Sequence, residues 1–195
     1  MSRPSQTETA VLGVLSVMPM TGYAVRAAIR DVIGHFWSES FGQIYPTLAR
    51  LESGGLVSRG GPGGEYAITP AGLGRLRARL REPVQPATPR SGLLLRLFFG
   101  RHLGLEACRD LVRDARSEAE AQLERYAAIR AEIAGERGTD ADQPFWLLTV
   151  AAGEHGARST ITWADDALVS LEAMYGRRRK RHRGSPGRSP RGGAA

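Results

Sequence analysis

Apolar residues recur along most of this chain with the period of a helix, and polar or glycine-containing stretches separate the segments. Dense apolar residues over 8–17 predict a first, largely buried helix that Pro19 ends. Thr21 is expected to cap a second helix over 22–33, with Tyr23 and Ala27 on its inner face. The predicted core of this part of the chain comprises Leu12, Leu15, Tyr23, Ile44, Leu48, Leu51 and Ile68.

The most informative stretch is 36–57. Ser40 and Gln43 have the spacing of a capping box, which predicts a third helix beginning near Phe41. Pro46 is then the sixth helical residue, so it is expected to kink the first turn. Ile44, Leu48 and Leu51 form one apolar stripe. The stripe leaves Thr47 at the boundary and directs outward Gln43, Pro46, Arg50 and Ser53.

A β-hairpin is predicted next, with strands over 56–59 and 65–68 joined by a glycine-rich turn over 60–64. Thr69 and Pro70 then open a further helix. Its apolar edge consists of Leu73, Leu76 and Leu80. The arginines on its other side are expected either to form a solvated face or to touch DNA phosphates; they are Arg75, Arg77, Arg79 and Arg81. A helix followed by a two-stranded wing is the DNA-reading half of a winged helix-turn-helix.

The rest of the chain is predicted to be helical. Residues 83–92 contain three prolines and form a linker after a first domain over 1–82. A heptad-like pattern predicts a long helix over 105–133, and Pro144 starts a last helix that ends near Tyr175. Helices with exposed apolar stripes, attached to a small DNA reader, favour a dimerisation domain over 93–176. The fold class is therefore mainly α, with a two-stranded β wing.

The charge distribution changes how the high pI is interpreted. The chain carries +7 in total, and residues 177–195 alone carry eight basic and no acidic side chains, which leaves −1 elsewhere. A strongly basic body is therefore not evidence for DNA binding. With no apolar residues for a core, 177–195 is predicted to be a disordered tail that either holds DNA phosphates or is dispensable.

This sequence lacks the signals of several classes of protein. Cys108 is the single cysteine and the four histidines have no ligand spacing, so we expect no metal and no cofactor. No phosphate-binding loop or nucleophile elbow is present, and Glu154 and His155 diverge on a helix, so an enzyme is not expected. No apolar run reaches the roughly 18 residues of a membrane span. No secretory segment follows Met1, so the cytoplasm is the expected location.

Specific motifs over about residues 8–80 resemble the PadR-like family of transcriptional regulators. They are Pro19-Met20-Thr21-Gly22-Tyr23, Phe36-Trp37, Gly42-Gln43-Ile44-Tyr45-Pro46-Thr47-Leu48, Arg50-Leu51-Glu52, Gly55-Leu56-Val57 and Tyr66-Ala67-Ile68-Thr69-Pro70-Ala71-Gly72. The hydrophobic run over 93–100 is similar to the start of the longer C-terminal domain in a subset of that family. The resemblance implies a dimeric bacterial repressor, associated with the nucleoid, whose repression a small molecule relieves.

The candidate DNA-binding residues are Gln43, Tyr45, Thr47, Arg50 and Arg59. Arginine suits guanine and glutamine suits adenine in the major groove, and a dimer predicts a pseudopalindromic operator with half-sites about 10 bp apart. Unlike most wings of the family, this one has no basic residue at its tip. Candidates for an aromatic effector pocket, or otherwise for core packing, are Trp37, Phe99, Trp146 and Trp163. The alternative function is a winged-helix module that binds proteins and no specific DNA.

Overall fold

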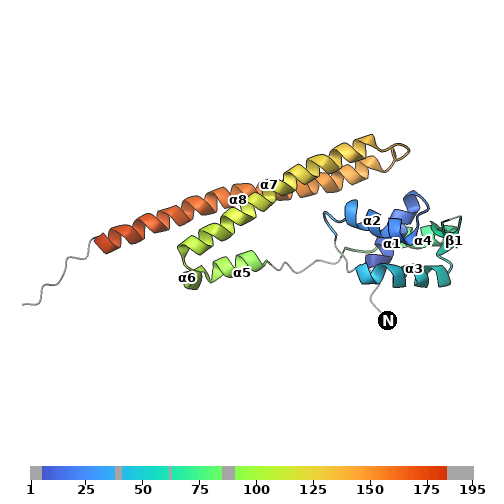
Figure 1. Cartoon of the computed structure of the whole chain (residues 1–195), viewed down its shortest axis with the longest axis horizontal. Coiled ribbons are helices and arrows are strands. Elements are labelled where there is room, and N and C mark those ends of the chain that lie inside the picture. Colours follow the sequence, from blue (N-terminus) through green and yellow to red (C-terminus); the bar gives the residue numbers. More distant parts are fainter. Residues whose placement is uncertain (1–5, 38–40, 62, 85–90, 184–195) are drawn as a thin grey trace, which may run out of the picture. The chain divides into compact units, whose positions relative to one another are not determined.

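The computed structural model describes residues 6–37, 41–61, 63–84 and 91–183 (Figure 1). The chain divides into two compact units. The first comprises Met1–Ala87 together with Glu132–Thr149, and the second comprises Thr88–Ala131 together with Val150–Ala195. The first unit contains α1 (Gln6–Val17), α2 (Gly22–Asp31), a 3-10 turn η1 (Phe41–Gln43), α3 (Ile44–Ser53), β1 (Val57–Gly60), β2 (Glu65–Ile68) and α4 (Pro70–Leu80).

Helix α2 begins as predicted, but it buries a different face. The Thr21 hydroxyl accepts a hydrogen bond from the backbone N–H of Ala24 at 3.2 Å, which confirms the predicted cap. Val25 and Ile29 are the buried residues of this helix. Tyr23 was expected in the core and is 71% exposed. It precedes Val25 by two positions, about 200° around the helix, so the two side chains cannot share a face.

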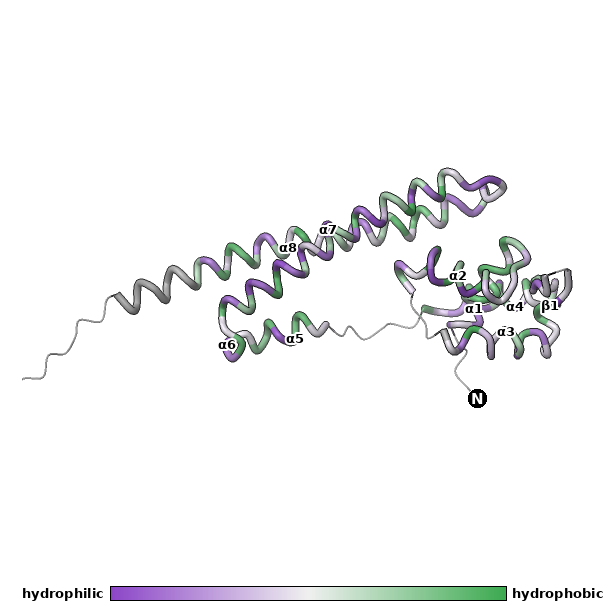
Figure 2. The backbone as a smooth tube through the Cα atoms, viewed as in Figure 1, coloured by the Kyte–Doolittle hydropathy of each residue, from purple (hydrophilic) through white to green (hydrophobic). Residues whose placement is uncertain are grey.

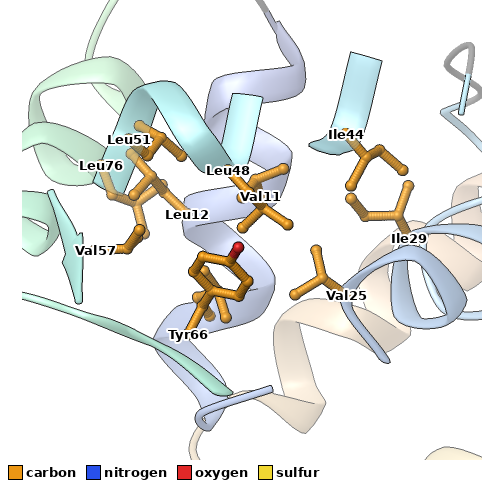
Figure 3. Close-up of a cluster of buried hydrophobic side chains, with 11 residues drawn as sticks. Val11, Leu12, Val25, Ile29, Ile44, Leu48, Leu51, Val57, Tyr66 and Leu76 are labelled. Atoms are coloured by element: carbon orange, nitrogen blue, oxygen red, sulfur yellow. The ribbon is translucent and has the colours of Figure 1, made fainter. Parts of the chain in front are cut away.

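The core of the first unit draws side chains from α1, α2, α3, α4 and both strands (Figure 3). Leu12 and Leu15 of α1 are buried, as are Ile44, Leu48 and Leu51 of α3, so the predicted stripe of α3 is confirmed. Ile68 is partly buried against the same cluster. The remaining contributors were not among the predicted core residues, although Leu76 was expected on the apolar edge of its helix and Val11 lies in the helix predicted to be largely buried. They are Val11, Val25, Ile29, Val57, Tyr66 and Leu76.

Helix α3 starts later than predicted, and this changes the place of Pro46 in the helix. The 3-10 turn η1 precedes the α-helix, which begins at Ile44, so Pro46 is the third α-helical residue and not the sixth. The first four N–H groups of a helix have no intrahelical acceptor, so the missing N–H of Pro46 costs no hydrogen bond there. The Ser40 half of the predicted capping box lies outside the described residues, and Gln43 makes no side-chain cap.

The wing is an antiparallel hairpin in which Val57 pairs with Ile68 and Gly60 with Glu65. Gly61 and Gly64 in the turn have positive φ angles of 76° and 66°, which glycine adopts without steric cost. A further backbone bridge joins β2 to the connection between α1 and α2. The N–H of Met20 donates to the carbonyl of Tyr66 at 3.0 Å, and the N–H of Tyr66 donates back at 2.8 Å.

Helix α4 begins as predicted, because the Thr69 hydroxyl accepts from the N–H of Gly72 at 3.0 Å and Pro70 is its first residue. Leu76 is buried and Leu73 packs against the core. Leu80, expected on the same apolar edge, is exposed in the last turn of the helix. Residues 85–90 of the predicted linker lie outside the described part of the chain.

The second unit is helical in its described part. Its elements are α5 (Gly92–Phe98), α6 (Gly100–Leu103) and most of α7 (Leu105–Gly135) and α8 (Gln143–Arg183). Apolar and polar residues alternate along α7 and α8 (Figure 2). Ion pairs Arg116–Asp165 at 2.7 Å and Arg109–Glu172 at 3.8 Å link the two helices in antiparallel order. The buried seam consists of Cys108, Val112, Ala119, Tyr126, Val150, Ala157 and Ala164.

Helix α8 is longer than the sequence predicted. It was expected to end near Tyr175 and to give way to a disordered tail, whereas it continues to Arg183. Arginine and lysine have high helix propensity, and cations are favourable at the C-terminal end of a helix, so a basic composition does not oppose extension. Residues 184–195 of the predicted tail lie outside the described residues. Within the described residues, no helix is both long and apolar enough to cross a membrane.

Candidate nucleic-acid interface

The outer face of α3 and its preceding turn is exposed, short-chained and hydrogen-bonding. It lies opposite the buried stripe of Ile44, Leu48 and Leu51. The exposed residues on it are Gln43, Tyr45, Pro46, Ala49, Arg50 and Ser53. Since the inner face is fixed in the core, the orientation of these side chains is set by the packing of the whole first unit. The geometry suits a helix that offers side chains to the edges of bases.

Thr47 is not part of this surface. It was expected at the boundary and offered as a contact to a thymine methyl group or a phosphate, but the residue is only 2% exposed. It lies three residues after Ile44 and four before Leu51, which places it on the buried side of the helix. We therefore remove Thr47 from the candidate DNA contacts.

Tyr45 joins α3 to the start of α2. Its ring lies against Gly22, where an added Cβ would be 3.0 Å from Tyr45 Cε1, and about half of the residue remains exposed. The absence of a side chain at Gly22 allows this close approach. The first turn of α2 and the first turn of α3 therefore form one continuous surface, with the exposed Tyr23 beside Gly22 in the chain.

Arg59 of β1 lies along the wing. Its Nε donates to the carbonyl of Gly64 at 3.4 Å, and its guanidinium carbon is 5.4 Å from the centre of the Tyr66 ring. The described residues of the turn are glycines, so they offer backbone groups alone. Arg59 is exposed, so the basic group that this wing can offer lies on β1 and not in the turn.

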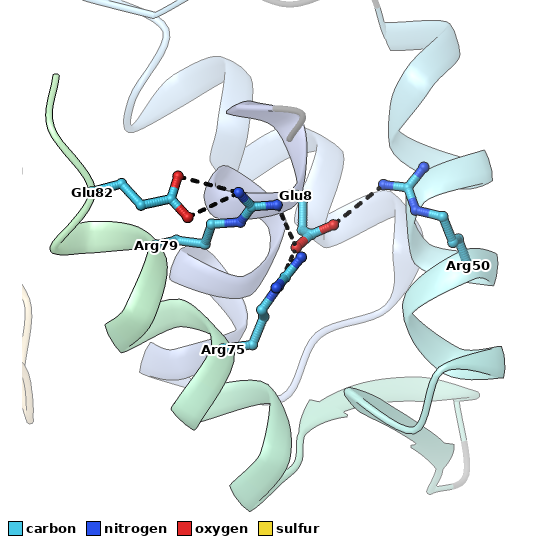
Figure 4. A network of polar contacts seen from close by, with 5 residues as sticks. All are labelled: Glu8, Arg50, Arg75, Arg79 and Glu82. Carbon is cyan, nitrogen blue, oxygen red and sulfur yellow. Dashed lines mark hydrogen bonds and ion pairs between the residues drawn. The ribbon is translucent and has the colours of Figure 1, made fainter. Parts of the chain in front are cut away.

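Arg50 takes part in an ion-pair cluster that connects three helices (Figure 4). Glu8, in the first turn of α1, accepts from Arg75 Nε at 2.9 Å and lies 3.6 Å from Arg79 Nη2 and 3.7 Å from Arg50 Nη2. Arg79 also pairs with Glu82 at 3.1 Å. The arginines of α4 were expected to form a solvated face or to touch phosphate. Arg79 does not fit the solvated face, because it is enclosed in this cluster.

The sequence contained a signal for the cluster that was not used. Glu8 precedes Leu12 and Leu15 by four and seven residues, so its carboxylate lies on the buried stripe of α1. A carboxylate at such a position needs a cationic or hydrogen-bonding partner, since burial of an unpaired charge is costly. The identity of the three arginines followed only from the packing of α1 against α3 and α4.

The four aromatic residues suggested for an effector pocket are divided between the two units. Trp37 packs against the core of the first unit, and its indole N–H donates to Gln6 Oε1 at 3.1 Å. Trp146 also belongs to the first unit, whereas Phe99 and Trp163 belong to the second. Phe99 is exposed and makes an edge-to-face contact with Phe98 at 5.1 Å.

Trp163 lines an open groove of about 1150 Å³ within the second unit. Its walls are mainly apolar and include Leu97, Leu105 and Val112, and two charged residues, Arg101 and Asp166, lie at the groove. Cys108 is buried in the wall, where its thiol lies 3.7 Å from the carbonyl of Gly100. The arrangement can accommodate an apolar group carrying one charged substituent.

Two family models match the chain. Residues 11–78 match that of the transcriptional regulator PadR-like family, and residues 89–172 match one described as the virulence activator alpha C-terminal domain. Residues 11–78 are a domain of the PadR-like family of transcriptional regulators. The first match includes α3 with its exposed surface, and the second covers most of the helical second unit.

Relatives and solved structures agree with this assignment over most of the chain. The negative transcriptional regulator PadR of Bacillus subtilis is 24% identical over 176 residues, which cover 84% of this chain and 96% of the relative. The structure of a PadR-like transcriptional regulator from Bacillus cereus is similar with a TM-score of 0.75 and 25% identity, covering 86% of this chain and 99% of that one. The virulence activator AphA of Vibrio cholerae gives 0.69 and 27% over the same shares.

Structures of Bacillus subtilis PadR in complex with operator DNA and with p-coumaric acid share the fold, with TM-scores of 0.73 and 0.74. Their identities are 22% and 21%, and each match covers 86% of this chain and 99% of that one. The predicted fold class, a winged helix-turn-helix with a two-stranded wing and a helical C-terminal part, is thereby confirmed.

Proposed function

We propose that this PadR-like regulator binds double-stranded operator DNA as a homodimer and represses the genes beside it. The observation that carries the proposal is the exposed outer face of α3, held in position by a buried inner face and adjoining a two-stranded wing. The complex of Bacillus subtilis PadR with operator DNA supports the same use of this fold. Binding to DNA places the protein at the bacterial nucleoid.

Base recognition is assigned to the side chains at the exposed end and middle of α3. Gln43 is suited to the N6 and N7 groups of adenine, and Arg50 to O6 and N7 of guanine. Tyr45 adds a contact from the surface shared with α2, and the exposed Arg59 beside Tyr66 is the wing's contribution. Each good bidentate pair discriminates by about 1–3 kcal/mol, so one α3 is insufficient and two copies reading a pseudopalindrome are required.

Dimerisation is assigned to the helical part of the chain over 93–176. Several large apolar residues in this part are exposed, which is costly unless another surface covers them. They are Leu94, Leu95, Phe98, Phe99, Leu103, Phe145, Leu148, Val169 and Met174. A second copy of the chain would cover such a surface symmetrically.

The named relatives support the proposal that repression is relieved by a small aromatic acid. Bacillus subtilis PadR is a negative regulator and has been crystallised with p-coumaric acid. In this chain the groove beside Trp163 offers an apolar wall and the cation Arg101, which fit an aromatic ring and a carboxylate. A ligand that binds one arrangement of the dimer better than another would change the affinity for DNA.

The test is binding of the purified chain to the promoter fragment upstream of its own coding region, followed by fluorescence anisotropy. Gln43→Ala and Tyr45→Ala are each expected to weaken operator binding about 5- to 150-fold, because each removes a contact of about 1–3 kcal/mol. Ser117→Ala, an exposed polar residue of α7, is the matched control and is expected to bind normally.

Wild-type protein that is folded and dimeric but binds no promoter fragment would contradict the proposal and favour the protein-interaction module. A reporter assay decides the direction of regulation. Deletion of the gene is expected to raise expression from the bound promoter, whereas a fall in expression would identify an activator.

A further inference from the structure

Glu8 is an almost buried carboxylate beneath the DNA-reading surface, and it contacts arginines from two different helices. Its side chain is 10% exposed. Arg75 donates to one oxygen at 2.9 Å, and Arg79 lies 3.6 Å from the same oxygen. The other oxygen lies 3.7 Å from Arg50 Nη2 (Figure 4). The carboxylate therefore connects the recognition helix α3 to α1 and α4 through a side chain that α3 also presents to solvent.

The three arginines differ in how completely they are committed to this cluster. The Arg79 side chain is 8% exposed and is held by Glu82 as well, so it belongs to the interior. Arg50 is 56% exposed and approaches Glu8 with one terminal nitrogen. Guanidinium is a planar fork with five N–H donors, so contact with Glu8 on one edge leaves donors free on another.

We propose that Glu8 is a positioning residue that sets operator specificity by holding Arg50 in one orientation. This inference rests on the proposed DNA binding by α3. In the operator complex Arg50 keeps its contact with Glu8 while its outer edge meets a guanine. On unrelated DNA, Arg50 gains a phosphate only by turning away from Glu8, so the ion pair opposes that contact. The result is weaker non-specific binding and a preserved specific contact.

Glu8→Gln is the direct test, because it keeps the shape of the side chain and removes its charge. Arg50 is then free to reach phosphates, and the ratio of operator to random-sequence affinity is expected to fall about two- to fivefold, the strength of a partly exposed ion pair. The salt dependence of binding to random DNA is expected to steepen by about one unit of log–log slope, which corresponds to one additional phosphate contact.

Glu82→Gln is the matched control. It removes the same charge from the same cluster, but Glu82 pairs with Arg79 and not with Arg50. We expect it to leave the specificity ratio at the wild-type value. In an Arg50→Ala background, Glu8→Gln is expected to have no further effect on the ratio, since the coupled partner is absent.

A second variant covers the case in which Glu8→Gln does not fold. Glu8→Asp keeps the charge beside Arg75 and Arg79 and shortens the reach to Arg50, so it is expected to lower the ratio without changing net charge. Equal ratios for Glu8→Gln and Glu82→Gln, or a wild-type ratio for Glu8→Asp, would overturn the inference. Failure of the wild-type protein to bind any DNA would instead overturn the proposed function.

Discussion

Gly72, the third residue of α4, has no room for a side chain. An added Cβ would overlap the carbonyl oxygen of Leu56 and lie 2.9 Å from Ile68 Cγ1, both in the hairpin region. Alanine normally stabilises a helix relative to glycine, but here its methyl group must displace backbone. Gly72→Ala is therefore expected to lower the free energy of unfolding by about 1–3 kcal/mol, measured by urea denaturation.

Gly74, two residues further along the same helix, provides the opposite case. It is exposed and an added Cβ meets nothing within 4 Å. Gly74→Ala is expected to raise the free energy of unfolding by about 0.5–1 kcal/mol through helix propensity alone. Equal effects of the two substitutions would show that α4 does not pack against Leu56 as described.

Individual residues were predicted well where one helical stripe decides their burial. Ile44, Leu48 and Leu51 are buried as expected because a four-three spacing fixes them on one side. Tyr23 and Thr47 were misplaced because their positions depend on how α2 and α3 are rotated about their axes against the rest of the core. Rotation is a property of the packed unit, and the local sequence constrains it weakly.

Helices α7 and α8 approach closely at Gly153, whose missing side chain receives the Tyr126 ring. An added Cβ would overlap Tyr126 and lie 2.6 Å from its Cε1 atom. Because Tyr126 is itself buried in the seam, the ring cannot move aside freely. Gly153→Ala is expected to destabilise the helix pair by about 1–3 kcal/mol, measured by thermal unfolding followed by circular dichroism.

Gly156→Ala is the control on the same helix, since an added Cβ there meets nothing within 4 Å. It is expected to stabilise slightly, as helix propensity predicts. Combining Gly153→Ala with Tyr126→Leu should cost less than the sum of the single changes, because the overlapping ring is gone. Strict additivity would show that the two residues do not touch.

Secondary structure was predictable where a specific residue starts or stops an element. Thr21, Thr69 and Pro70 marked helix starts correctly, and the glycine-rich turn marked the wing. The start of α3 was predicted too early, because capping signals do not distinguish a 3-10 turn from an α-helix. The end of α8 was predicted too early, because a basic sequence without apolar residues has no core to pack against but can still be helical.

The proposed dimerisation is expected to depend on the exposed apolar residues of the helical part. Phe98 of α5 is 82% exposed, so its removal should leave the folded monomer unchanged. We expect the wild-type chain to sediment as a dimer at micromolar concentration. Phe98→Ser is expected to raise the dimer dissociation constant at least about tenfold, as loss of a buried aromatic anchor does.

Val84→Ser is the corresponding control, because Val84 is 92% exposed in the first unit and lies outside the assigned dimerisation domain. It is expected to leave the dissociation constant unchanged. A monomeric wild-type protein at micromolar concentration would contradict the assignment. The heptad-like residues Cys108, Val112, Ala119 and Tyr126 are buried between α7 and α8 of one chain, so the spacing predicted this helix pair and not the exposed apolar residues on which dimerisation is proposed to depend.

The backbone bridge between Met20 and Tyr66 makes β2 the middle of three extended segments, hydrogen-bonded on one side to β1 and on the other to the connection between α1 and α2. The hairpin is therefore held to the rest of the first unit through β2, and its glycine-rich turn takes no part in this pairing. A protein engineer can exploit this separation. The loop between Gly60 and Glu65 could be replaced, for example by a lysine-rich loop, without disturbing the hydrogen bonds between β2 and Met20.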